Sequence, residues 1–230
     1  MLKFLPVLLA LGYALVAYQL SVWRTHRMLD RTSHPLGDAG LLAEGARLAR
    51  ALDLPGLNIH VFEVEPVNGL AAPDGRIFLT EGFLRKYRAG EVTAKEMAAV
   101  IAHELGHVAL GHSRRRMVDF TGANAVFVML TALLSRFLPF IGIWIANLIS
   151  GALMARMSRR DEFEADEYAS ALLVKAGIGT GPQKTLFAKL GGLTGHRTAV
   201  PAWLLSHPST EDRIAAIEAN EARWRLDQPV

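Results

Sequence analysis

The sequence predicts a mainly helical fold of the α+β class, in which a small antiparallel sheet precedes one central helix. Three observations predict it. An alternating apolar run over 57–64 and a short apolar run over 76–80 indicate strands, a well-capped helix over 93–112 contains a His-Glu-x-x-His motif, and two long apolar stretches adjoin them. We therefore expect an N-terminal membrane anchor over 1–24 and one folded domain over 36–230, interrupted by a hydrophobic helical hairpin.

Composition narrows the classes of protein to which the chain can belong. It has 230 residues, a hydrophobic fraction of 51% and a formal net charge of +3, which suits one domain with added membrane segments. It has no cysteine, so disulfides are excluded and any metal must be held by His, Asp or Glu. The basic residues cluster beside apolar runs, so we expect contact with membrane lipid and none with nucleic acid.

The first apolar stretch, Phe4–Trp23, carries no charge and has about the 20 residues that a helix needs to cross a bilayer. We interpret it as a retained anchor. A cleaved signal peptide is the alternative, although no A-x-A site follows the apolar run. Arg24, Arg27 and Arg31 follow the stretch, whereas Lys3 precedes it. The positive-inside rule therefore predicts that the folded domain faces the cytoplasm. We expect the membrane to be a bacterial-type inner membrane.

Short elements come before the central helix. A helix is predicted over 38–52, with Asp38 as its cap, followed by strands over 57–64 and 76–80 with a Pro-Asp-Gly turn between them. A short helix over 80–87 comes next. These elements predict a small antiparallel sheet directly in front of the central helix.

The central helix holds the residues with the clearest chemistry. Thr93 and Glu96 form a capping box at its start. His103 and His107 are four residues apart, so both imidazoles lie on one face and can bind a single zinc ion. Glu104 follows the first histidine directly, where it can hold and activate a zinc-bound water. This spacing predicts a metal site with hydrolytic chemistry.

A second apolar region, over 117–157, follows an Arg-Arg-Arg run and has about the length of two membrane spans. Ser135-Arg136 and Pro139 interrupt it, which predicts a helical hairpin. Arginines at both outer ends place those ends in the cytoplasm. A buried hairpin inside a soluble domain is the alternative, so the sequence leaves open whether this hairpin spans the bilayer.

A hydrolytic zinc site needs a third protein ligand and an open position for water. On a continuous helix His112 would point about half a turn away from His103, so it is set aside. In the acidic run over 158–169, Glu162 and Asp166 share a helical stripe with alanines and leucines, and buried acids need a metal or a partner. We therefore predict Glu162 as the third ligand and Asp166 as the acceptor that orients a ligand histidine. A solvated acidic helix is the alternative.

Four segments in order resemble one known family, the membrane-associated zinc metallopeptidases that include the heat-shock protease HtpX and the CAAX prenyl endopeptidases. They are His-Glu-Leu-Gly-His over 103–107, Ser-Arg-x-x-Glu-x-x-x-Asp over 158–166, Asn-x-x-Ala-x-Pro-x-Gly-x-Ile-Phe-x-Thr over 68–80, and His-Pro-Ser-Thr over 207–210. The resemblance covers residues 68–217. It implies a zincin-type fold of the gluzincin class with one zinc ion per chain.

The resemblance also implies a function. It implies a membrane-anchored zinc endopeptidase that hydrolyses unfolded or membrane-associated proteins, with Glu104 activating the water. An edge strand would pair with an extended peptide substrate, and His207 would contact the substrate or the transition state, a structural role at a helix start being the alternative. The strand residues concerned are Asn68, Gly69, Leu70 and Ala71. A non-cleaving zincin-fold module that binds membrane proteins as a chaperone is the alternative function, and the oligomeric state is left open.

Overall fold

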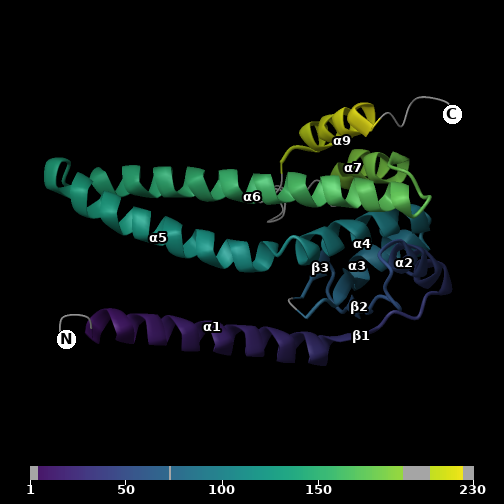
Figure 1. Ribbon diagram of the computed structural model, residues 1–230, viewed down its shortest axis with the longest axis horizontal. Coiled ribbons are helices and arrows are strands. Elements are labelled where there is room, and N and C mark those ends of the chain that lie inside the picture. The colour runs from purple at the N-terminus through teal and green to yellow at the C-terminus, as the bar shows by residue number, and fades with distance from the viewer. Residues whose placement is uncertain (1–4, 73, 194–207, 225–230) are drawn as a thin grey trace.

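The computed structural model describes residues 5–72, 74–193 and 208–224, whose arrangement is shown in Figure 1. A body of helices and one small sheet lies at one end of the molecule. Two long helical projections extend from it in the same direction, namely the N-terminal helix and a hairpin of two helices. The prediction of a mainly helical protein with a small sheet is confirmed.

The sheet has four strands in the order β1-β2-β4-β3. They are β1 Ser33–Pro35, β2 Ile59–Phe62, β3 Gly69–Ala71 and β4 Ile77–Thr80. β1 pairs with β2, and β3 with β4, in antiparallel fashion, but β2 and β4 run parallel. The prediction of an antiparallel sheet is therefore wrong, because the two strands expected from the sequence form its parallel pair.

The chain between β2 and β4 explains this difference. After β2 it crosses to the far side of β4 and forms β3 there, so that the predicted turn joins β3 to β4. Gly75 in this turn has a φ of 87°, a conformation that glycine adopts at little cost. β3 is consequently an edge strand, paired on one side only among the described residues.

Helix α4, Ala94–Ala109, is the centre of the body. Its fully buried Met97 and Ile101 belong to one apolar cluster with Leu79 of the sheet and Leu173 of the long helix α6. Burial of such side chains contributes about 1.5–3 kcal/mol each. The other body helices are α2 Ala39–Ala51, α3 Glu81–Arg88, α7 Gly181–Leu193 and α9 Thr210–Trp224.

The second projection is an antiparallel hairpin of α5, His112–Phe137, and α6, Gly142–Lys175. Among the described residues, α5 is the one helix long and apolar enough to cross a membrane by length and composition, and little of it is buried. Many large apolar side chains of the hairpin are more than half exposed. They include Phe120, Val128, Met129, Phe137, Trp144 and Leu148.

Helix α6 is continuous over 34 residues. Its first half forms one arm of the hairpin, and its second half enters the body and carries Glu162 and Asp166. The predicted end of the hairpin at residue 157 therefore falls inside a helix. The apolar arm and the acidic residues are parts of one rigid element.

The N-terminal helix α1 covers Leu5–Thr32. Its C-terminal end packs against the sheet, because Leu29 is buried in a small apolar cluster with Phe78, and Arg76 donates a hydrogen bond to Asp30 at 2.7 Å. The N-terminal end of α1 and the tip of the hairpin lie at the same end of the molecule (Figure 1).

Candidate metal centre

The start of α4 is held by its capping box, as predicted. The Thr93 hydroxyl oxygen accepts from the Glu96 N–H at 3.2 Å, and the Glu96 carboxylate accepts from the Thr93 N–H at 2.8 Å. Burial would raise the pKa of Glu96, but bonds to Lys189 and to Thr93 and Thr185 hold this pKa below its usual range. The first turn of the helix that carries the motif is thereby fixed.

Helices α4 and α6 cross in close contact where Gly106 faces Ala165. A Cβ atom on Gly106 would lie 3.0 Å from the carbonyl oxygen of Ala165 and 3.1 Å from its Cα atom. A side chain at this position would therefore push the two helices apart. The contact brings the His-Glu-x-x-His turn of α4 next to Glu162 and Asp166 of α6.

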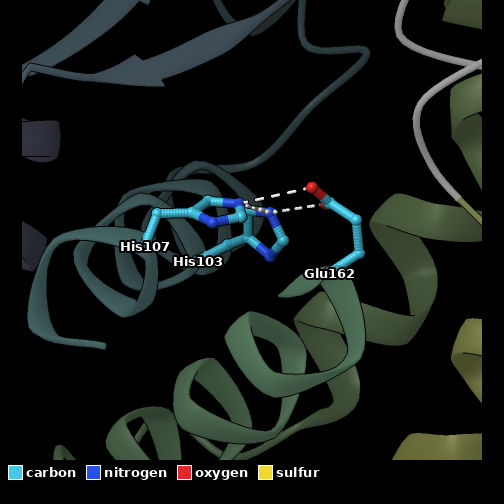
Figure 2. Close-up of side chains that lie close together, drawn as sticks. All are labelled: His103, His107 and Glu162. Atoms are coloured by element: carbon cyan, nitrogen blue, oxygen red, sulfur yellow. Dashed lines mark hydrogen bonds and ion pairs between the residues drawn. The ribbon is translucent and has the colours of Figure 1, made fainter. Parts of the chain in front are cut away.

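Donor atoms of three residues from these two helices converge (Figure 2). His103 Nε2 lies 3.1 Å from His107 Nε2 and 3.3 Å from Glu162 Oε2, and His107 Nε2 lies 3.6 Å from Glu162 Oε1. A tetrahedral zinc ion with ligand distances of about 2.0–2.2 Å separates its ligand atoms by about 3.3–3.6 Å. The two distances to Glu162 lie within this range and the distance between the two imidazole nitrogens lies just below it, so the three residues fit a divalent metal ion such as zinc.

The surroundings favour a positive charge between these side chains. Burial would lower the pKa of His103, but hydrogen bonds with Asp166 and Glu162 outweigh it and raise this pKa to about 9. Burial, followed by the charge on His103, lowers the pKa of His107 to about 3. The negative charge of the carboxylates thus stabilises a cation at this point. A divalent metal ion needs the same negative surroundings.

The outer nitrogen of His103 is bonded to Asp166, where Nδ1 donates to Oδ1 at 2.9 Å. Arg213 of α9 holds the same carboxylate with two bonds of 2.6 Å. Burial would raise the pKa of Asp166, but the Arg213 charge outweighs it and lowers this pKa. With its proton on Nδ1, His103 presents an unprotonated Nε2 to a metal. The structure thus places Asp166 against the outer nitrogen of His103, and its role in orienting a metal ligand stays a prediction.

Sequence analysis gave Arg213 no role in the site. One signal could have found it: Arg213 lies four residues before Ile217, and both side chains are buried on one face of α9. A buried cation needs an acidic partner, and Asp166 is an acid on the buried stripe of α6. The fold is needed to show that the two residues meet, because α9 lies far along the chain from α6.

Glu104 lies beside the donor atoms in a cleft of about 430 Å³. Burial raises the pKa of its carboxyl group, which suits a group that takes and returns a proton near neutral pH. Strand β3 forms a wall of the cleft. A Cβ atom on Gly69 would lie 2.7 Å from Val100 and 3.3 Å from Glu104 Oε1, so glycine permits this close approach.

The structure brings most of the predicted site residues to this cleft. Its lining includes the three predicted ligands, Glu104, and the four predicted strand residues Asn68, Gly69, Leu70 and Ala71. Asp166 lies behind His103. His207 lies outside the described residues, so its contact with substrate stays a prediction.

His112, set aside as a ligand, lies against the outer side of His107. The two Nδ1 atoms are 2.7 Å apart. α4 ends at Ala109, and Gly111, with a φ of 66°, precedes the start of α5 at His112. This break turns the His112 ring back toward His107, which a continuous helix would not do.

Two histidines and a glutamate around one point, with a buried glutamate beside them in a cleft, are typical of a metal-dependent hydrolase. The chain belongs to peptidase family M48, whose model matches residues 35–221. Members of this family are metal-dependent peptidases. The expected membership in a metallopeptidase family is therefore confirmed.

Individual relatives agree with the family. Metalloprotease LoiP of Escherichia coli is 32% identical over 161 residues, which cover 70% of this chain and 61% of LoiP. Metalloprotease YcaL of the same organism is 31% identical, over 75% of this chain and 68% of YcaL. Mitochondrial metalloendopeptidase OMA1 of Schizosaccharomyces pombe is 30% identical, over 70% of this chain and 45% of OMA1. The matched part thus spans between 45% and 68% of these relatives.

Proposed function

We propose that this chain is a membrane-anchored zinc endopeptidase with a zincin-type fold, HtpX-like and of the gluzincin class. One observation carries the proposal: His103, His107 and Glu162 converge on one point in a cleft that also holds Glu104 and edge strand β3. When bound, the zinc ion supplies a Lewis acid that polarises the scissile carbonyl group and activates water. The family match supports the metallopeptidase part of this proposal.

The chain's own residues supply the proton transfers. Glu104 takes a proton from the attacking water and passes it to the leaving amine. Because burial raises its pKa, the carboxyl group can hold this proton between the two steps. Asp166 accepts a hydrogen bond from Nδ1–H of His103, which leaves Nε2 available to bind the metal. His207 is proposed as a contact to substrate or transition state on sequence grounds alone.

Strand β3 supports an extended peptide as the substrate. It pairs with β4 on one side, and its residues line the cleft. A peptide added along its other edge would be bound mainly through backbone hydrogen bonds, with little selection of side chains. The proposed contacts are Asn68, Gly69, Leu70 and Ala71. Unfolded or membrane-associated proteins offer segments of this kind.

The two projections support membrane anchoring. We propose an anchor over 1–24 and a metallopeptidase domain over 36–230, interrupted by the hairpin over 117–157. Both projections leave the body in the same direction, so one bilayer can contain them while the body stays outside (Figure 1). Arginines follow the apolar stretch of α1 and flank the hairpin. They favour a body that faces the cytoplasm, and we propose that the membrane is a bacterial-type inner membrane.

The variant Glu104→Gln tests the proposed base. It keeps the side-chain size and the three ligands, so zinc content should stay at wild-type level while hydrolysis of casein falls at least about 100-fold. A chelator should abolish wild-type hydrolysis, and Glu63→Gln, at an exposed position, should change nothing. Full activity in Glu104→Gln would contradict the proposal. A wild-type protein that binds casein without ever releasing product would instead be the non-cleaving binding module.

The variant Glu162→Ala tests the third ligand. We expect purified protein to lose most of its zinc, because two histidines alone hold the ion weakly. Glu167→Ala is the matched control, since Glu167 lies on the same helix with its side chain 47% exposed. Metal content is measured by mass spectrometry after dialysis. Equal zinc content in the two variants would show that Glu162 is not the third ligand.

A further inference from the structure

We propose that His112 is a positioning residue, which links the metal ligand His107 to a carboxylate held by arginines and so fixes how His107 presents its Nε2. The inference rests on the proposed metal site. His112 is only 1% exposed, yet each of its ring nitrogens has a polar neighbour. A histidine buried with both nitrogens engaged orders the groups on either side of it.

The proposed metal binding of His107 determines which ring donates in the hydrogen bond between His107 and His112. His107 points Nε2 toward the donor atoms of His103 and Glu162. For this nitrogen to bind a metal, the ring proton must be on Nδ1. Since His107 Nδ1 lies 2.7 Å from His112 Nδ1, His107 donates and His112 accepts. The proton of His112 is consequently on its Nε2.

The contact of His112 with Glu164 also requires the proton of His112 to be on Nε2. His112 Nε2 lies 3.3 Å from Glu164 Oε2 and 4.0 Å from Asp161 Oδ1. Ionised carboxylates only accept hydrogen bonds, so His112 Nε2 must be the donor. Arg115 lies 2.5 Å from Glu164 and 2.9 Å from Asp161, and Arg160 lies 2.8 Å from Glu164. These arginines hold Glu164 ionised and in place.

The two ligand histidines are therefore supported in parallel ways. His103 donates directly to Asp166, which Arg213 holds. His107 reaches Glu164 through one additional ring, and Arg115 holds that carboxylate. In both cases an arginine-bound carboxylate fixes the tautomer and the orientation of the ligand ring.

A second metal ion is the competing explanation for this cluster, because His112, Asp161 and Glu164 also bring three donor atoms together. However, the guanidinium group of Arg115 lies within 2.9 Å of the same two carboxylate oxygens. Arg160 also lies 2.8 Å from Glu164, and Arg116 lies 3.5 Å from Asp161, so guanidinium groups already neutralise both acids. We therefore infer one zinc ion per chain, with the His112 cluster as its support.

The test uses the full-length protein with zinc, purified in detergent. His112→Phe keeps a buried ring but removes both hydrogen bonds. In His112→Asn the amide oxygen takes the place of Nδ1 and can accept from His107, whereas the amide nitrogen ends short of the position of Nε2. His34→Phe is the control, because His34 is exposed on β1. Zinc per chain is measured by mass spectrometry after equilibration with chelators of graded strength, and thermal unfolding of the metal-free proteins checks that each variant folds.

We expect zinc retention to fall roughly 10–100-fold in His112→Phe, to recover in part in His112→Asn, which restores the bond to His107, and to be unchanged in the control. The inference is overturned if His112→Phe holds zinc like the wild type, if His112→Asn loses as much as His112→Phe, or if the wild type holds two zinc ions. Should His112→Phe not fold without metal, His112→Leu takes its place under the same criteria. Retention is measured without substrate, so its result stands apart from the test of Glu104 as the base.

Discussion

The two halves of α6 present similar residues to opposite surroundings. In the body half Leu173 is fully buried, whereas in the hairpin half Leu148 is 73% exposed and Trp144 is 75% exposed. Both halves belong to one continuous helix, so helical periodicity does not cause the difference. The neighbours cause it, because α4 and α9 pack on the body half while α5 alone is the main partner of the other.

Both halves of α6 have apolar surface that must be covered, but different partners cover it. An apolar helix must be covered, and large exposed apolar surfaces mark contacts with membranes or partners. The body half is covered by the rest of the chain. For the hairpin half we propose the bilayer, and three measurements test this contrast.

Cysteine labelling gives the largest contrast, because the chain has no cysteine of its own. In inverted membrane vesicles, whose cytoplasmic face is turned outward, a membrane-impermeant maleimide should label Leu54→Cys in the body and leave Leu148→Cys in the hairpin almost unlabelled. Both positions are exposed in the protein itself, at 45% and 73%, so only the surroundings differ. Denaturing detergent should make both reactive. Equal labelling in the intact vesicles would show that the hairpin lies in water.

Truncation of two leucines on α6 gives the next largest effect. Leu173→Ala should lower the free energy of unfolding by about 2–5 kcal/mol, because it leaves a cavity in the core. Leu148→Ala should change it by less than about 0.5 kcal/mol in detergent, because no protein packing is lost. Pulse proteolysis in urea measures both values. Similar losses would mean that protein also covers the hairpin half.

Alanine substitutions at two glycines give the smallest effect. Gly106→Ala should cost about 1–3 kcal/mol by pushing α4 from α6, and it should weaken zinc retention. Gly122→Ala on α5 is the matched control, since a Cβ atom there meets nothing within 4 Å; it should stabilise the helix by up to about 1 kcal/mol. The same unfolding and zinc measurements apply. Unchanged zinc retention in Gly106→Ala would show that the helix contact does not position the donors.

Local features of this chain could be predicted from its sequence. The capping box of Thr93 and Glu96 and the spacing of His103 and His107 depend on residues a few positions apart, so one helix suffices to define them. Glu162 could be selected because a buried acid is costly without a partner. These arguments need no knowledge of the fold.

Features that join distant segments could not be predicted in the same way. The parallel pairing of β2 with β4 depends on where β3 is inserted, and alternation of residues does not reveal this. Arg213 meets Asp166 only because α9 packs on α6. His112 reaches His107 because the helix breaks at Gly111, a change of direction that overrides helical spacing.

The continuity of α6 has a mechanical consequence. From Leu148 to Glu162 the helix runs without a break for about 21 Å, at 1.5 Å per residue, and it bears on α4 at the contact of Gly106 with Ala165. It is therefore a lever whose fulcrum lies beside the donor atoms. A tilt of its outer arm would move Glu162 relative to the two histidines of α4, so it would change the distances among the proposed metal ligands.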